Sequence, residues 1–272
     1  MSNNLTATIL MAVYHDKSFI KEAVDSLLPE VGNDIELLII DDHSLDGSEE
    51  ILKEFQAQTS KLNMIRNKQN QGLGYCLSLG TEKAKGKYII RMDADDICIK
   101  GRIAKQISFL EENPEIDIVG GAAIEINEFG QPGLLRKRPT QHDEIAKVIW
   151  ANPLIHATVA FRKDRILKVG NYNPKLRRRQ DYDLWFRCLS AGLRFANLSE
   201  PLIYYRFSSN SHRKQGLKQA INQAKIGLKG CWMLKLPLWQ YLAVTAPIFR
   251  AVFPPYLSHL IYRSLAFLDP RK

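Results

Sequence analysis

Short apolar runs alternate with amphipathic segments through the first half of this 272-residue chain. The apolar runs are rich in β-branched residues and have the length of strands, at 8–13, 35–40, 62–66 and 87–92. Between them, apolar residues recur at helical spacing, at 18–28, 47–58 and 73–84. This alternation predicts an α/β fold with a mostly parallel sheet flanked by helices, in which ligands bind where the strands end.

The second half of the chain is less regular. Strands are expected at 116–126, 157–162 and 202–207, and helices are expected at 141–150 and 181–192. Gly192 is expected to end the last of these helices as its C′ residue. The basic stretches 135–138 and 175–179 are expected to be loops between elements.

Two of the predicted strands end in acidic residues. Asp41 and Asp42 follow the second strand, and Asp93, Asp95 and Asp96 follow the fourth. In a parallel sheet both groups open onto the same crevice, where crowded carboxylates repel one another unless a cation compensates them. Mg²⁺ or Mn²⁺ prefers such oxygen ligands and links them to the phosphates of a substrate. A simpler role as helix caps stays open for Asp42 and Asp96.

The net charge of +9 comes entirely from the last part of the chain. Residues 201–272 contain eleven Lys or Arg and one acidic residue, Asp269. Such an excess predicts an anionic partner, either nucleic acid or an acidic membrane surface. The four cysteines are far apart and form no C-x-x-C pair, and the N-terminus lacks the pattern of a signal peptide, which together favour the cytoplasm.

The C-terminal tail also contains two uncharged stretches, 236–249 and 251–262, separated by Arg250. Both are shorter than the roughly 20 apolar residues of a spanning helix, so we expect an element that lies in the headgroup region of an anionic leaflet. The aromatic residues of the tail sit among long aliphatic runs, which argues against nucleic-acid binding. The alternative is a tail that folds back onto the rest of the protein as helices.

Five segments together resemble the family 2 glycosyltransferases over about residues 6–207. In chain order they are "ILMAVYHD", "IIDDHSLDGS", "NQGLGYCLSLGTEKAKGKYIIRMDADD", "NPLIHATVAFRK" and "RRQDYDLWFRCLSAG". Members of that family are inverting, nucleotide-sugar-dependent enzymes with the Rossmann-like GT-A fold. The resemblance therefore implies a nucleotide-sugar donor, with UDP as the expected nucleotide, and Mn²⁺ or Mg²⁺ as cofactor.

The same resemblance assigns roles to individual residues. It implies that Asp41, with the backbone around Val13 and Tyr14, holds the nucleotide base, that Asp93 approaches the ribose, and that Asp95 ligates the metal. It places the catalytic base at Asp181 and the acceptor beside His156 and Gln180. Further donor positions are Ala12, Asp42, Gly72, Arg91 and Ala94.

The chain departs from the family pattern at two of these positions. Proline is usual at Ala12, and glutamate is commoner at Gln180. Neither change removes a charge that the chemistry requires. The Q-x-x-R-W signature of processive members is missing where it is expected, which favours the transfer of a single sugar. Three roles stay open for the basic residues Arg177, Arg178 and Arg179. They could contact the diphosphate of the donor, contact an anionic acceptor, or form a solvated loop.

These expectations divide the chain into a catalytic domain, 1–207, and a basic, aromatic helical region, 208–272. Within the domain, 1–96 would bind the nucleotide and 97–207 the acceptor. We expect a lipid-linked glycan as acceptor, in the synthesis of a bacterial surface polysaccharide at the inner face of the cytoplasmic membrane. The rival enzyme is a phosphatase or phosphotransferase with a D-x-D nucleophile, but that motif would follow the first strand, where this chain has "VYHD". A nucleic-acid-binding protein is the nonenzymatic rival.

Overall fold

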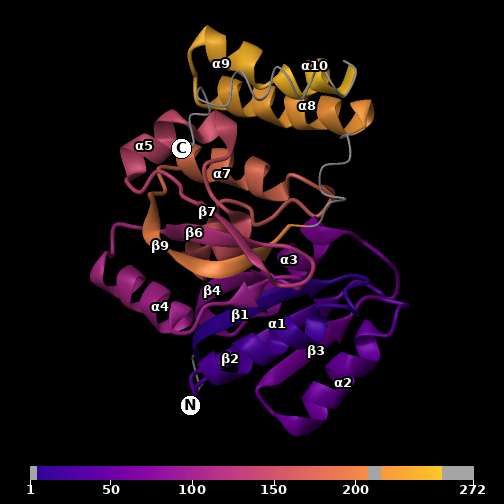
Figure 1. Ribbon diagram of the computed structural model, residues 1–272. Helices are drawn as coiled ribbons and strands as arrows, with labels where there is room; N and C mark the ends of the chain where they lie inside the picture. Colours follow the sequence, from indigo (N-terminus) through magenta and orange to yellow (C-terminus); the bar gives the residue numbers. More distant parts are fainter. Residues whose placement is uncertain (1–4, 208–215, 253–272) are drawn as a thin grey trace.

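The computed structural model describes residues 5–207 and 216–252, and within them a single curled, mixed sheet of nine strands runs through the protein (Figure 1). The strand order is β3-β2-β1-β4-β8-β6-β9-β5, and β7 pairs with β6 outside this path. The strands are β1 (Leu5–Val13), β2 (Ile35–Asp41), β3 (Leu62–Arg66), β4 (Gly86–Asp93), β5 (Ile97–Cys98), β6 (Ile118–Ile126), β7 (Pro132–Arg136), β8 (Ala160–Arg162) and β9 (Phe195–Arg206).

The N-terminal half is the parallel, alternating unit that the sequence predicts. Strands β3, β2, β1 and β4 are all parallel, and their connections contain the helices α1 (Ile20–Leu27), α2 (Ser48–Gln58) and α3 (Leu73–Lys83). The register places Val13 of β1 beside Asp41 of β2, and Ala12 beside Asp93 of β4. The carboxyl ends of these three strands therefore meet at one edge, which confirms that the two acidic groups open toward the same side.

The second half is mixed because β8 runs antiparallel to both of its neighbours, β4 and β6. Strand β9 is again parallel to β6, while β5 and β7 pair antiparallel with β9 and β6. The helices of this half are α4 (Arg102–Glu112), α5 (His142–Lys147), α6 (Lys163–Lys168) and α7 (Gln180–Ser190). Short 3₁₀ turns, η1 (Leu28–Glu30), η2 (Ile149–Ala151) and η3 (His156–Thr158), complete the connections.

The prediction of a loop at 135–138 is wrong for its first two residues, because Leu135 and Arg136 belong to β7. This strand exposes four of its five side chains, so it shows no alternation that a sequence pattern could detect. It forms through backbone pairing with β6. By contrast, α7 ends at Ser190 as expected: Gly192 has a φ of 79°, and the Leu193 amide donates to the Cys188 carbonyl at 3.0 Å.

Apolar side chains pack on both faces of the sheet. One cluster joins the sheet to α1, α2 and α4, and the other joins it to α3, α5, α6 and α7. Strand β1 contributes to both, with Ile9 and Met11 on one side and Leu10 on the other. A strand buried on both faces reads as the continuous apolar run seen in the sequence.

Three helices of the tail lie in the described residues, namely α8 (Leu217–Met233), α9 (Leu238–Ala243) and α10 (Ala246–Val252). Figure 1 shows them as a layer at the end of the molecule opposite α2, with α8 beside α7. Gly230 of α8 faces the ring of Phe186, and Gly227 faces Val244 and the Tyr182 hydroxyl. The alternative of helices folded back onto the domain therefore holds for this part. The remainder of the expected tail, from residue 253, lies outside the described residues.

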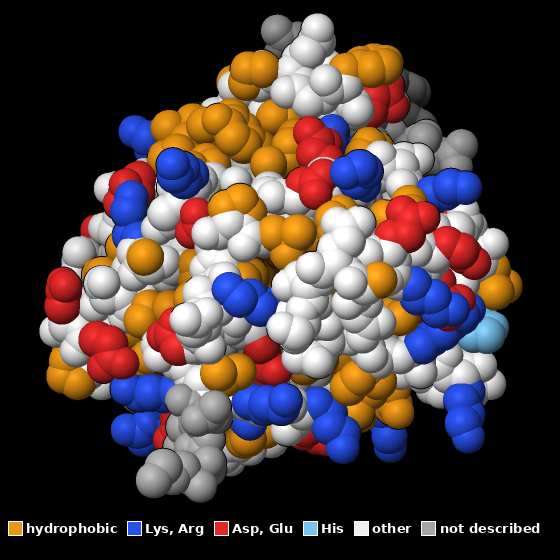
Figure 2. All heavy atoms as spheres, turned by 90° about the horizontal axis from the view of Figure 1, so that it is seen from below, with side chains coloured by type: hydrophobic (Ala, Val, Ile, Leu, Met, Phe, Trp, Pro, Cys, Tyr) orange, Lys and Arg blue, Asp and Glu red, His pale blue; other side chains and the backbone are white. Residues whose placement is uncertain are grey.

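Among the described residues, no helix combines the length and the apolar character needed to cross a membrane. Seen from the side of the N-terminal half, acidic and basic side chains lie interspersed over the surface, and Lys and Arg gather along one edge (Figure 2). The division at residue 207 stays a prediction.

Candidate active site

A cavity of about 450 Å³ opens at the carboxyl ends of β1 and β4. This volume is in the range of small-molecule sites in proteins. The cavity is walled by the end of β1 and the turn after it, the loop before α3, the turn after β4, and the loop before α7. Its lining residues are Ala12, Val13, Tyr14, Asp16, Asp42, Asn70, Gly72, Leu73, Cys76, Asp93, Ala94, Asp95, Arg177 and Arg178.

Most residues that the sequence assigns to the donor and the metal line this cavity. They are Ala12, Val13, Tyr14, Asp42, Gly72, Asp93, Ala94 and Asp95. Asp41 and Arg91, which the sequence also assigns to the donor, are buried and do not line it. Asp16 was missed, although it carries the same signal as the assigned acids, a carboxylate just after a buried strand.

Asp41 and Asp42 are neighbours with different partners. The Asp41 carboxylate is fully buried, accepts a hydrogen bond from the Ser44 amide (3.0 Å) and pairs with Arg66 (3.2 Å). Asp42 accepts hydrogen bonds from the amides of Gln71 (2.8 Å) and Gly72 (2.7 Å). It also accepts from the side chains of Asn67 and Asn70. Asp42 therefore fixes the loop that forms one wall of the cavity, and the assignment of Asp41 to the nucleotide base stays a prediction.

Gly72 is placed where the loop before α3 meets the loop before α7. Its φ is +93°, and an added Cβ would lie 2.7 Å from Cγ of Arg177. The Arg177 guanidinium donates to the carbonyl oxygen of Asn70 at 2.8 Å. The site thus requires glycine for two reasons, a left-handed backbone and a close approach. Together these contacts bring a basic residue to the wall that faces the acids.

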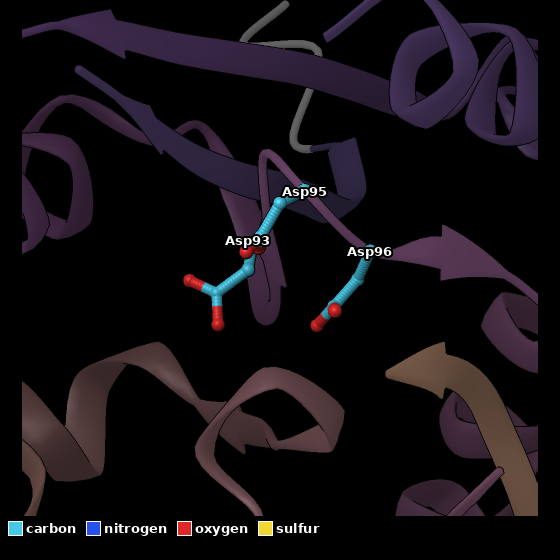
Figure 3. Close-up of side chains that lie close together, drawn as sticks. All are labelled: Asp93, Asp95 and Asp96. Carbon is cyan, nitrogen blue, oxygen red and sulfur yellow. The ribbon is translucent and has the colours of Figure 1, made fainter. Parts of the chain in front are cut away.

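Asp93, Asp95 and Asp96 leave the turn after β4 on the same side (Figure 3), and a ligand oxygen of each lies within 4.8 Å of the others. Asp93 pairs with Arg91, and Asp96 accepts a hydrogen bond from the Arg206 amide at 2.8 Å. Burial, together with the charges of Asp93 and Asp16, raises the pKa of Asp95 to about 7. Burial and the charges of Asp93 and Asp95 raise the pKa of Asp96 well above its ordinary value.

The donor set suits a hard divalent cation. Carboxylate oxygens at this spacing are the ligands that Mg²⁺ and Mn²⁺ prefer, and one oxygen of Asp96 is buried without a hydrogen-bond partner among the described residues. Asp16 adds a fourth carboxylate to the cavity, and burial raises its pKa to about 6. A bound cation would relieve the repulsion that raises these pKa values.

Arg91 explains how Asp93 is oriented. Its guanidinium is buried and pairs with Oδ1 of Asp93 through one nitrogen, while its Nε and the other terminal nitrogen have no partner among the described residues. Burial opposes the charge of Arg91, but Asp93 holds the pKa of this arginine above its usual range. Arg91 therefore acts on the cavity through Asp93, from behind its wall.

His156 lies beside this arginine rather than in the cavity. Its Nε2 is 2.9 Å from the hydroxyl of Tyr172, and its ring contacts Trp185 at 6.1 Å between centroids. Burial and the charge of Arg91 lower the pKa of His156 well below its ordinary value, so the imidazole is neutral at pH 7. The predicted acceptor contact of His156 stays a prediction, since its ring nitrogen is occupied by Tyr172 in this arrangement.

Asp181 occupies the second position of α7 and is partly exposed. Its Oδ2 accepts a hydrogen bond from the Asn152 side-chain amide at 2.9 Å. Burial raises the pKa of Tyr172, and the negative charges of Asp181 and Asp93 raise this pKa further, so both acids lie near its hydroxyl. Gln180 is buried, and its Oε1 has no partner among the described residues.

Asp183, two residues further along α7, pairs with Arg187 at 2.9 Å. Both are mostly buried, and Arg187 also donates to the carbonyl oxygens of Val169 and Asn171 at 2.7 Å each. This ion pair ties α7 to the segment after α6. Of the two acids in the first turn of α7, Asp183 is therefore held in an ion pair, whereas Asp181 forms none among the described residues.

Three comparisons with known proteins agree with this geometry. The model of the family described as "Glycosyl transferase family 2" matches residues 8–183. The chain is 30% identical to the "Putative glycosyltransferase EpsE" of Bacillus subtilis, over 93% of this chain and 92% of that protein. It is 32% identical to the "O-antigen biosynthesis glycosyltransferase WbnJ" of Escherichia coli, over 77% of this chain and 83% of the relative.

A further relative from Escherichia coli is the "UDP-Gal:alpha-D-GlcNAc-diphosphoundecaprenol beta-1,3-galactosyltransferase", 28% identical over 80% of each chain. Among solved structures, TarS 1–349 of S. aureus in complex with UDP-GlcNAc superimposes with a TM-score of 0.70 at 16% identity, covering 91% of this chain and 72% of that one. This likeness confirms the expected GT-A type of fold. With the family model matching residues 8–183, the chain belongs to glycosyl transferase family 2 and is a glycosyltransferase.

Proposed function

We propose that this protein transfers one sugar from a UDP-sugar to a hydroxyl of a lipid-linked glycan, with inversion at the anomeric carbon and with Mn²⁺ or Mg²⁺ bound. The observation that carries the proposal is the cluster of Asp93, Asp95 and Asp96 beside a cavity of about 450 Å³. Arg177 and Arg178 line the same cavity. Carboxylates for a cation and cations for a phosphate thus share one site of nucleotide size.

The donor is held by the cavity walls. Tyr14 exposes 46% of its surface at the cavity and offers a ring to a nucleobase, next to the backbone of Val13. Asp93, fixed by Arg91, is available to the ribose, and Asp95 is the metal ligand. The divalent cation, when bound, stabilises the charge that develops on the departing diphosphate. Arg177 and Arg178 add positive charge from the loop before α7.

The acceptor hydroxyl is activated by Asp181. As the hydroxyl oxygen bonds to the anomeric carbon, its proton passes to a carboxylate oxygen of Asp181. The bond between that carbon and the diphosphate oxygen breaks, and its electron pair leaves with the nucleoside diphosphate. One base is sufficient, because the leaving group is stabilised by charge rather than by protonation. The free oxygen of Asp181 is available for this task, since Asn152 occupies only Oδ2.

The lipid carrier is proposed from the relatives and from the tail. One relative, by its printed name, acts on a sugar linked to diphosphoundecaprenol, and another serves O-antigen biosynthesis. Six large apolar side chains of α8–α10 are more than half exposed; they are Trp232, Leu238, Trp239, Leu242, Phe249 and Val252. An enzyme with such a face can rest on the leaflet that anchors its acceptor, at the cytoplasmic side.

Replacing Asp181 by Asn is the direct test. Asparagine keeps the size of the side chain and caps a helix about as well, but it cannot accept the proton. We expect turnover to fall by about 10²- to 10⁴-fold while donor affinity barely changes. Thermal-shift screening of nucleotide sugars with Mn²⁺ selects the donor, and turnover is measured as release of nucleoside diphosphate with an N-acetylglucosaminyl diphosphoprenol acceptor.

Two outcomes would contradict the proposal. Near-normal sugar transfer by the Asp181→Asn protein would remove Asp181 as the base. Mn²⁺-independent binding of every nucleotide sugar in the screen would remove the metal from the site. The competing phosphotransferase reading predicts instead a phosphate bound covalently to Asp93 or Asp95, which mass measurement of the intact protein detects.

A further inference from the structure

The side chain of Asn152 donates a hydrogen bond to the proposed base, from its Nδ2 to Oδ2 of Asp181 at 2.9 Å. We propose that Asn152 is a positioning residue, which holds the base so that its other oxygen faces the acceptor hydroxyl. This inference rests on the proposed role of Asp181. The resemblance to the family assigns no role to Asn152, which lies 29 positions before Asp181 in the chain.

The backbone around Asn152 is built for this contact. Asn152 follows the turn η2 and has φ 54° and ψ 73°, a left-handed conformation that few residues other than glycine and asparagine adopt readily. The backbone N–H of Asn152 donates to the Ile149 carbonyl at 3.1 Å. The hydroxyl of Tyr182 donates to the carbonyl of Trp150 at 2.5 Å. The turn is thereby tied to the residue that follows Asp181.

The remaining polar atom of the Asn152 side chain sharpens the argument. Its Oδ1 is buried without a hydrogen-bond partner among the described residues. An unpaired buried carbonyl is unfavourable, so the side chain is not oriented to satisfy its own oxygen. It is placed where its NH₂ group meets Asp181. An NH₂ group donates and cannot accept, so it supports the ionised carboxylate and never competes for the proton.

The base is fixed from its own side as well. Arg179, at the start of α7, has a left-handed φ of 62°, and its carbonyl accepts the Asp183 amide at 3.1 Å. These constraints set the backbone of Asp181, while the rotation of its carboxylate is set by Asn152. A carboxylate held by one oxygen presents the other in a defined direction, which is the condition for proton transfer in a single geometry.

Asn152→Gly removes the amide and keeps the left-handed backbone. We expect kcat to fall by about 10- to 100-fold, while the donor KM and the Kd for UDP with Mn²⁺ stay unchanged, because Asn152 does not line the donor cavity. Asn171→Gly is the matched control. Asn171 also has a left-handed φ, of 58°, and is buried. Its side-chain NH₂ group, however, donates to the Ser78 carbonyl at 3.0 Å. We expect this control to lose stability and to keep its kcat.

Asn152→Asp gives a second readout, which tests whether the side chain at position 152 lies against the carboxylate of the base in solution. It places a second carboxylate against Asp181, so the pKa of the base rises. The acidic limb of the kcat–pH profile should move upward by about one unit or more. The other ionisable groups around Asp181, namely Tyr172, Tyr182 and Arg179, are the same in this variant. The shift can therefore be assigned to the new pair.

The outcomes separate this inference from the proposed function. If Asp181→Asn is inactive but Asn152→Gly turns over within about twofold of the parent and Asn152→Asp keeps the parent pH profile, the positioning role is wrong and the base stands. If Asp181→Asn is itself active, both fail. A loss of kcat in Asn152→Gly that disappears in the Asp181→Asn background supports the inference, because the two residues then act as one unit. If Asn152→Gly fails to fold, the kcat of Asn152→Asp above the shifted pKa decides: a carboxylate at position 152 cannot donate to Asp181, so a kcat within about twofold of the parent would overturn the positioning role.

Discussion

At the scale of single residues, the acids around the cavity set how the metal-free protein responds to pH. Burial and mutual repulsion raise the pKa of Asp95 to about 7 and that of Asp16 to about 6, against an ordinary value of 3.8. The unfolded chain has the ordinary value. A raised pKa in the folded state means that stability is present at low pH and is lost as the pH rises through the folded pKa.

We therefore predict that protein treated with a chelator melts at a lower temperature at pH 8 than at pH 6. Ionising one buried carboxyl across this window costs of the order of 1 kcal/mol, or a fall in Tm of roughly 2–4 °C. Mn²⁺ should reverse the fall, because it binds the ionised form. Thermal melting with and without Mn²⁺ checks this, and Asp95→Asn is the control, which should show a smaller pH dependence. An equal fall in Asp95→Asn would exclude Asp95 as the source.

The sequence predicts that these acids converge, and the reason is the parallel sheet. Carboxyl ends of neighbouring strands meet, so Asp41 and Asp93 both lie level with the end of β1. It does not predict which way each carboxylate turns. Asp41 turns inward to Arg66 and Ser44 because the turn after β2 takes it there. Long-range partners such as Asn152 for Asp181 depend on how two distant loops fold, which strand and helix patterns do not record.

At the scale of elements, the cavity depends on two loops that fix each other. The Asp42 carboxylate accepts hydrogen bonds from four donors and so fixes the loop before α3. That loop contacts the loop before α7 where Gly72 approaches Arg177. Regular elements of the first half are predictable because each has an apolar periodicity. The strand β7 was not predicted because most of its side chains are exposed, and α4, which begins at Arg102 soon after the short strand β5, was also not predicted.

Gly72→Ala should open this contact between loops. Alanine at Gly72 is strained by a φ of +93° and brings its Cβ to 2.7 Å from Arg177, so Arg177 must move away from the cavity. We expect the Kd for UDP with Mn²⁺ to rise by about tenfold, which corresponds to about 1.4 kcal/mol, as measured by calorimetry. The control is Gly192→Ala, with a φ of +79° and no atom within 4 Å of its Cβ. It should lose about 1 kcal/mol of stability and bind UDP normally. Equal binding by both variants would show that the close approach is unimportant.

At the scale of the whole molecule, one arginine joins the acid turn to three other parts. Arg206, the last residue of β9, donates to the carbonyl of Asp95 at 2.8 Å and pairs with Glu22 of α1 at 2.6 Å. It also donates to the carbonyl of Asn127 at 3.1 Å, in the turn between β6 and β7. The acid turn is thus held by α1 of the first half of the chain and by β9 and the β6–β7 turn of the second half.

The tail shows where a sequence pattern leaves two readings open. The same apolar residues that predict an interfacial element also predict helices packed on the domain, and in the described part of the tail some of these side chains are packed while others are exposed. Cys231 and Val244 are buried, whereas Leu238 and Leu242 are about four-fifths and three-quarters exposed. A deletion from residue 231 would therefore remove the buried Cys231 and the contact of Val244 with Gly227, and is a poor test of membrane binding.

Substitutions of exposed apolar residues on α9 and α10 test membrane binding without removing these core contacts. We predict that the combined variant Leu238→Ser, Leu242→Ser and Phe249→Ser binds vesicles containing phosphatidylglycerol at least about tenfold more weakly than the parent, because apolar insertion supplies much of the binding. Trp239 is left in place because its ring packs on Trp150 at 5.3 Å between centroids. Co-sedimentation with vesicles, compared with thermal melting of each variant, gives the measurement.

The control for this prediction lies on the hairpin of β6 and β7. Phe129 and Leu134 are 79% and 73% exposed, so Phe129→Ser with Leu134→Ser removes similar apolar surface from another place. This control should bind vesicles as the parent does. Salt of about 1 M shortens the Debye length to about 3 Å and should release the parent only in part, since inserted side chains are not screened. Complete release of the parent by salt, or equal binding by the combined variant, would show that basic residues alone hold the protein at the membrane. In that case the exposed face of α9 and α10 would need another partner.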